Sequence, residues 1–149
     1  MKKIFLLGLI IIMFSSCALN KTPTNPEDFS RVLSELGYKI TNITDEYKGG
    51  ANVVLLAVDP EEKQHIEFYE FTTQAQAKNV FSNNNSNQRQ VGSGSSSSAS
   101  ASGNNWAYIS KSAGELYGFV SYIDNTLVFA RAPVKQRKTV KDALKKIGY

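Results

Sequence analysis

The side chains able to carry acid–base or nucleophilic chemistry are few in this chain. His65 is the only histidine, so mechanisms and metal sites that need two imidazoles are excluded. The serine-rich run at 92–98, GSGSSSS, lacks the G-x-S-x-G spacing of a nucleophile elbow. These patterns predict a partly exposed strand position for His65 and a linker for the serine run.

The carboxylates do not form an acid–base pair in the sequence pattern. Glu67 and Glu70 fall on opposite faces of a predicted strand, because side chains alternate along a strand. Asp59, Glu61 and Glu62 lie together in one predicted turn, but without the spacing of an EF-hand calcium loop. No phosphate loop or dinucleotide fingerprint is present either. The sequence therefore predicts a protein without a cofactor, without a metal and without catalytic residues.

Aromatic residues offer the first candidate for binding. Tyr69 and Phe71 share one face of a predicted strand, and Trp106 and Tyr108 share one face of another. Where aromatics occupy both faces of a strand, one set can form the core while the other is exposed to a ligand. We therefore take these four residues as a candidate binding surface. Core packing under a helix is the alternative.

The C-terminal region is the second candidate for binding, because basic residues dominate it. A cluster of this kind can rest against anionic lipid or a wall polymer. The alternative is the solvated face of an amphipathic helix. Its members, set against Asp142 alone, are Arg131, Lys135, Arg137, Lys138, Lys141, Lys145 and Lys146.

The N-terminal run Met1–Cys17, MKKIFLLGLIIIMFSSC, joins two lysines, an apolar stretch and two small residues before a cysteine. It resembles the signal sequence of bacterial lipoproteins, although Phe14 stands where leucine is usual. The resemblance implies cleavage between Ser16 and Cys17 and attachment of diacylglycerol to the Cys17 thiol, with palmitate as a typical acyl chain. The apolar stretch, 11 residues from Ile4 to Phe14, is shorter than the roughly 20 that a membrane-spanning helix needs.

The rest of the chain fits this interpretation. Cys17 is the only cysteine, so the chain holds no internal disulfide. Without Lys2 and Lys3, 15 basic residues face 13 acidic ones, a net charge near +2 that gives no argument for nucleic-acid binding. Ala18 follows the cysteine where inner-membrane lipoproteins of the family carry aspartate. The resemblance therefore implies an exported protein, anchored in the outer membrane if the organism has one.

Regular structure is predicted after a polar, proline-containing tether at 17–25. Asn25 and Pro26 suit the N-cap and first position of a helix, and Gly37 suits its end. Thr73 with Gln76 and Thr139 with Asp142 resemble capping boxes of two further helices. Apolar runs bounded by turns predict strands over 38–43, 52–58, 64–71, 106–110, 116–123 and 127–132.

One segment interrupts this pattern. Residues 82–105 are mostly Ser, Asn and Gly, and we expect a flexible loop because the segment has little apolar surface to bury. The short turns between neighbouring strands favour antiparallel pairing. We therefore expect one α+β domain over 26–149, with a single antiparallel sheet of about six strands and two or three helices packed largely on one face.

Together these observations favour a membrane-anchored surface lipoprotein whose domain binds an envelope protein or wall polymer, or serves as an accessory subunit. A small envelope hydrolase with an unrecognised site is the alternative. A deep pocket holding Glu67, Glu70 or Asp124 with a convergent polar group would favour the hydrolase.

Overall fold

A computed structural model describes residues 20–90 and 96–149. The predicted signal peptide at 1–16 and the lipidation residue Cys17 lie outside these residues, as does the start of the predicted tether. The elements, in chain order, are α1 (Pro26–Glu35), β1 (Lys39–Asn42), η1 (Thr44–Glu46), β2 (Val53–Val58), β3 (His65–Glu70), α2 (Gln74–Gln90), β4 (Ser96–Ser102), β5 (Trp106–Ala113), β6 (Leu116–Ile123), β7 (Thr126–Pro133), η2 (Val134–Gln136) and α3 (Arg137–Lys146).

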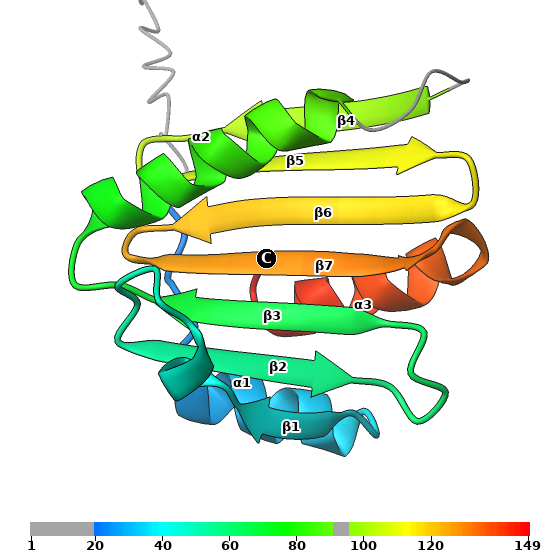
Figure 1. The fold of residues 1–149 in the computed structure, drawn as a ribbon, viewed down its shortest axis with the longest axis horizontal. Coiled ribbons are helices and arrows are strands. Elements are labelled where there is room, and N and C mark those ends of the chain that lie inside the picture. The colour runs from blue at the N-terminus through cyan, green and yellow to red at the C-terminus, as the bar shows by residue number, and fades with distance from the viewer. Residues whose placement is uncertain (1–19, 91–95) are drawn as a thin grey trace, which may run out of the picture.

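The strands form one antiparallel sheet in the order β1-β2-β3-β7-β6-β5-β4 (Figure 1). Two meanders, β1 to β3 and β4 to β7, meet where β3 pairs with β7, with Phe68 opposite Val128. The predicted α+β class with a single antiparallel sheet is confirmed. The sheet has seven strands rather than about six, and the additional strand is β4.

The helices divide between the two faces of the sheet. α1 and α3 lie on one face, which we call the closed face, and α2 crosses the other, which we call the open face (Figure 1). The expectation that the helices pack largely on one face therefore describes α1 and α3 but not α2. Ala77 of α2 is fully buried beside Val120 and Leu127, so its first turns form a second, smaller core.

The larger core lies between the sheet and the helices of the closed face. Phe29 and Leu33 of α1 are fully buried against it, and the ring centroids of Phe29 and Phe68 are 5.1 Å apart. Val140 and Leu144 of α3 join the same core. The residues of each pair are four positions apart, a spacing that places side chains on one side of a helix.

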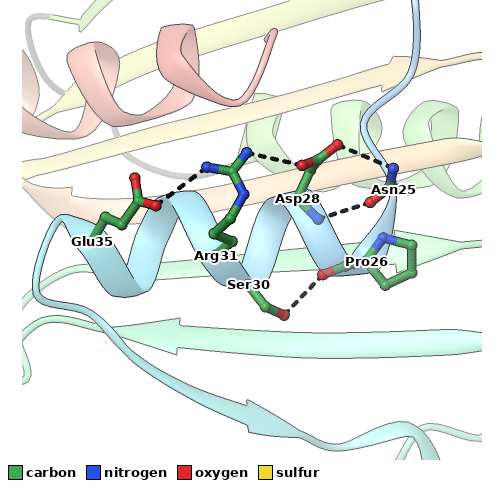
Figure 2. Close-up of polar contacts among 6 residues, drawn as sticks. All are labelled: Asn25, Pro26, Asp28, Ser30, Arg31 and Glu35. Carbon is green, nitrogen blue, oxygen red and sulfur yellow. Dashed lines mark hydrogen bonds and ion pairs between the residues drawn. The ribbon is translucent and has the colours of Figure 1, made fainter.

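α1 begins where the sequence predicts, for the predicted reason. The Asn25 Oδ1 accepts a hydrogen bond from the Asp28 backbone N–H at 2.7 Å, and its Nδ2 donates to the Asp28 carboxylate at 3.1 Å (Figure 2). Pro26 occupies the first turn, where its missing N–H costs nothing. Arg31 bridges Asp28 and Glu35 at 2.9 and 3.2 Å. The bond to Asn25 Oδ1 satisfies one of the backbone donors that a helix start leaves unpaired.

The two predicted capping boxes have different outcomes. Thr73 and Gln76 form theirs at the start of α2, where each side chain bonds to the backbone N–H of the other residue. The box at Thr139 and Asp142 is wrong. α3 begins at Arg137, directly after η2, so Thr139 already lies inside the helix and its start has no side-chain cap.

The predicted flexible loop at 82–105 is also wrong for most of its length. Residues up to Gln90 continue α2, and Ser96–Ser102 form β4, while 91–95 lie outside the described residues. Two physical reasons explain the difference. A helix anchored by buried residues in its first turns can extend through polar residues, and β4 pairs with β5 through backbone hydrogen bonds, which require no apolar side chain.

Candidate functional site

The structure does not bring the four aromatic candidates together in one surface. Phe71 is 1% exposed beneath α2, and Tyr69 lies half-buried beside it on the open face. Trp106 and Tyr108 lie on the closed face, where their rings stack with centroids 6.4 Å apart. Tyr108 in turn stacks on Phe119 at 5.7 Å, so most of this set serves as packing.

A groove lies on the open face, over the part of β5, β6 and β7 beside α2. Its volume is about 220 Å³. Its floor is the row in which Lys111 of β5, Gly118 of β6 and Arg131 of β7 lie opposite one another. The lining residues are Lys111, Ala113, Leu116, Tyr117, Gly118, Phe129 and Arg131.

Gly118 is the reason that a groove exists at this level of the sheet. Neighbouring strands lie about 4.8 Å apart, so a side chain at the central position would fill the space between its two neighbours. Glycine has no side chain to place between Lys111 and Arg131, and all three residues line the groove. The arrangement places two cationic side chains on either side of a hollow.

The walls of the groove are apolar. Leu116 is 41% exposed at one end, and Phe129 lies half-buried at the other.

Arg131 is exposed, and no ion pair among the described residues uses it. A guanidinium matches the planar geometry of a carboxylate or phosphate. The site is therefore chemically suited to an anionic group that carries an apolar part.

A second cavity, of about 250 Å³, adjoins the first through Phe129, which lines both. The Tyr69 hydroxyl donates to the Glu67 carboxylate here, and the rings of Tyr47 and Tyr69 meet edge to face at 5.0 Å. Burial raises the pKa of both phenols, and the negative charge of Glu67 raises it further. The raised pKa of Tyr69 fits its role as the hydrogen-bond donor to the Glu67 carboxylate.

The other carboxylates do not join Glu67. Glu70 faces the opposite side of the sheet, beside the start of α1. The buried Asp59 accepts from the backbone N–H groups of Lys63 and Gln64 at 2.7 and 2.6 Å, so it stabilises the β2–β3 turn. Asp124 accepts a hydrogen bond from the Asn105 side-chain amide, at the end of the sheet opposite to Asp59. Among residues 20–90 and 96–149, no three His, Cys, Asp or Glu side chains lie close enough to hold a metal ion.

His65 lies on the open face directly beside Arg131, in the row that continues the floor of the groove. Its ring is exposed and lies 3.3 Å from the Glu62 carbonyl oxygen. The expected partly exposed strand position is confirmed. The basic C-terminal cluster is divided, because Arg131 belongs to the groove whereas α3, on the other face, carries Lys138 in an ion pair with Asp142 at 2.7 Å.

Comparison with known proteins gives a likeness in fold. A GTP-binding regulator from Thermotoga maritima is similar with a TM-score of 0.52 and 14% identity, over 82% of this chain and 83% of that one. The extracellular domain of PknH from Mycobacterium tuberculosis gives a TM-score of 0.40 and 10% identity, over 84% and 90% of the two chains, which is too low to support an inference. No protein-family model matches the chain, and no curated protein matches it.

None of the helices among the described residues is long and apolar enough to span a bilayer. The sequence alone did not identify Lys111 and Gly118 as site residues, and it placed Arg131 only in the C-terminal cluster. One signal was present. Gly118 interrupts an otherwise bulky strand, LYGFVSYI, and an isolated strand glycine marks a place of close approach.

Proposed function

We propose that this chain is an exported lipoprotein, anchored through lipid on Cys17, whose domain is a binding module rather than an enzyme. The groove at Gly118 carries this proposal. It combines two cations, an apolar wall and an open approach, and its walls and floor come from strands of one sheet. A rigid sheet holds such a site in place before a ligand arrives, which limits the entropy lost on binding.

The chemistry of the groove defines the ligand class as an anion with a short apolar portion. Arg131 and Lys111 would bind a carboxylate or phosphate oxygen, and Leu116 and Phe129 would contact the apolar portion. An acidic side chain of an envelope protein or an acidic group of a wall polymer fits this description. A neutral molecule of the same shape would forgo the charged contacts and bind more weakly.

The binding test uses the lipid-anchored chain in nanodiscs, with hexanoate as the probe and its neutral amide, hexanamide, as the matched comparison. We expect hexanoate to shift the backbone resonances of Lys111, Gly118 and Arg131 and hexanamide to leave them nearly unchanged. Arg131→Gln should weaken hexanoate binding about tenfold, since hydrogen bonds to charged groups contribute about 1.5–3 kcal/mol. Lys146→Gln removes an exposed charge of α3, on the other face of the sheet, and should change nothing. Equal binding of both probes would contradict the proposal.

The anchor is supported by the N-terminal sequence, and it is tested separately. Labelled palmitate should be incorporated into the natural chain and not into Cys17→Ala. The variant should be recovered away from the membrane fraction, because two acyl chains hold a protein far more firmly than residual contacts do. Incorporation of palmitate into Cys17→Ala would refute Cys17 as the acceptor.

The rival hypothesis of a small envelope hydrolase has one observation in its favour, since Glu67 lines a cavity with the Tyr69 hydroxyl. In that scheme Glu67 would act as the general base. Glu67→Gln should then abolish ester or amide hydrolysis while leaving hexanoate binding intact. Under the binding proposal, the natural chain and Glu67→Gln release product equally slowly from a panel of nitrophenyl esters.

A further inference from the structure

The segment just after the proposed lipid anchor is fixed to the domain by one side chain. The Asn105 amide bonds both main-chain groups of Lys21. Its Oδ1 accepts from the Lys21 N–H at 3.1 Å, and its Nδ2 donates to the Lys21 carbonyl oxygen at 2.7 Å. The amide thus replaces a neighbouring strand for this one residue. The predicted free tether at 17–25 is therefore docked at Lys21.

We call the Asn105 side chain and its two bonds to Lys21 the clasp, and two further contacts hold it in place. The Asn105 Nδ2 also donates to the Asp124 carboxylate at 2.9 Å, and the Asp124 N–H donates to the Asn105 carbonyl oxygen at 2.8 Å. The Lys21 ammonium lies 4.6 Å from the centroid of the Trp106 ring, within cation–π distance. Both donors and the acceptor of the Asn105 amide therefore have partners, which fixes its orientation.

The clasp lies at one end of the sheet, and the groove opens toward the other. Asn105 precedes β5 and Asp124 follows β6, so the β4–β5 and β6–β7 turns share the clasp end (Figure 1). Glu115, in the β5–β6 turn, marks the opposite end, next to the groove residue Leu116. Strands of eight residues separate the two ends by roughly 25 Å.

The covalent chain limits how far the clasp can be from the membrane. Cys17 is four positions before Lys21, and a fully extended chain covers at most about 3.6 Å per residue, or about 14 Å in all. This reach is shorter than the sheet is long. The end that holds Lys21 must therefore stay near the lipid while the clasp is closed.

From this arrangement we infer that the Asn105–Asp124 end of the domain is a membrane-facing surface that contacts the lipid bilayer, and that the Gly118 groove faces away from the membrane. The inference depends on the proposed lipidation of Cys17. It assigns the clasp a function beyond packing, because the Asn105 side chain fixes the orientation of the domain relative to the membrane. The groove is then presented to partners in the surrounding envelope rather than to the lipid.

The only natural cysteine carries the lipid in this proposal, so a fluorophore that reacts with thiols labels only an introduced cysteine. Asn104→Cys places the dye at the clasp end, and Glu115→Cys places it at the groove end; both positions are exposed. Each lipidated chain is reconstituted into phosphatidylethanolamine–phosphatidylglycerol vesicles with an acceptor dye on the headgroups. We expect energy transfer from position 104 to exceed that from position 115 at least twofold.

Opening the clasp should remove this difference. Asn105→Ala, added to each labelled chain, should bring the two transfer efficiencies together, whereas Asn79→Ala on the exposed side of α2 should leave them apart. Lys21→Ala removes only the side chain at Trp106 and should narrow the difference partly, which provides a milder variant if Asn105→Ala unfolds. Circular dichroism checks the fold of each.

The outcomes separate the two proposals. A chain that fails to float with the vesicles refutes the lipid anchor, and the orientation with it. A chain that floats but shows equal transfer from positions 104 and 115 refutes the orientation alone. A difference that survives both Asn105→Ala and Lys21→Ala refutes the role of the clasp.

Discussion

The two faces of the sheet are built from the same strands, yet they follow different packing rules. On the closed face, α1 and α3 cover side chains that are almost completely buried. On the open face, α2 covers only part of the sheet and leaves the groove beside it. Because side chains alternate along a strand, each strand serves both environments at once.

β6 and β7 show the contrast residue by residue. Tyr117 and Phe119 of β6 face the larger core and are 2% and 6% exposed, while Gly118 between them faces the groove. In β7, Ala130 is fully buried and its neighbour Arg131 is exposed. The difference teaches that stability and binding are divided between alternate positions, so a substitution can affect one without the other.

The largest expected effect separates the two faces by stability. Phe68→Ala should lower the free energy of unfolding by about 3–5 kcal/mol, because Phe68 is fully buried against Phe29 and its loss leaves a cavity. Phe129→Ala on the open face should cost about 1 kcal/mol, since its ring is only partly buried. Urea denaturation of both variants measures the two losses of unfolding free energy. Equal losses would show that the open face packs as tightly as the closed one.

An alkaline titration tests one side chain of the closed face, Tyr38, next. Burial, together with the charge of Asp59, raises the pKa of Tyr38 to about 12, and its hydroxyl donates to the Gln64 Oε1 at 2.5 Å. The unfolded chain releases this proton near pH 10, so ionisation favours unfolding. The contribution of Tyr38 is fully present below pH 10 and is lost between pH 10 and 12. Burial also raises the pKa of Tyr149, which acts in the same direction.

Denaturation series from pH 9 to pH 11.5 check this prediction. The natural chain should lose stability steadily above pH 10, and Tyr38→Phe should flatten the decline without removing it, because Tyr149 and, on the open face, Tyr47 and Tyr69 still contribute. A slope that Tyr38→Phe leaves unchanged would contradict the assignment of Tyr38.

A cap variant should have a smaller effect on the same face. Asn25→Ala removes the acceptor for the Asp28 N–H at the start of α1 and should destabilise the protein by about 1 kcal/mol. Asn25→Ser keeps an acceptor and should restore most of the loss. Amide exchange should rise in the first turn of α1 and not in α2, and a rise in both helices would argue against independent faces.

The smallest effect on stability is expected at the groove. Gly118→Ala should leave the free energy of unfolding unchanged or raise it by up to about 1 kcal/mol, since Gly118 has an ordinary negative φ and glycine weakens a strand. The same substitution should weaken hexanoate binding, because the methyl group enters the hollow between Lys111 and Arg131. A large loss of stability would mean that the groove is part of the core.

The sequence predicted those parts of the fold that depend on neighbouring residues. The cap at Asn25 and the box at Thr73 bond within a few positions, and Ile123 pairs with Thr126 directly across the two-residue turn between β6 and β7. β4 was not predicted, because its stability comes from pairing with β5, and the alternation of Ser and Ala in its second half includes no large apolar side chain. The groove depends on register, which brings Lys111, Gly118 and Arg131 side by side from three strands, and local patterns do not reveal register.

The composition of β4 has an evolutionary consequence. Positions 97–102 are all exposed, and they belong to one of the two edge strands of the sheet. Natural selection for folding acts weakly on such positions, because a mutation there neither opens a cavity nor leaves a buried polar group without a partner. Among homologues, β4 should therefore drift faster in sequence than any other strand while keeping its length. The exposed side chains of β4 would differ between lineages, whereas Asn105, next to β4 in the chain, would stay the same.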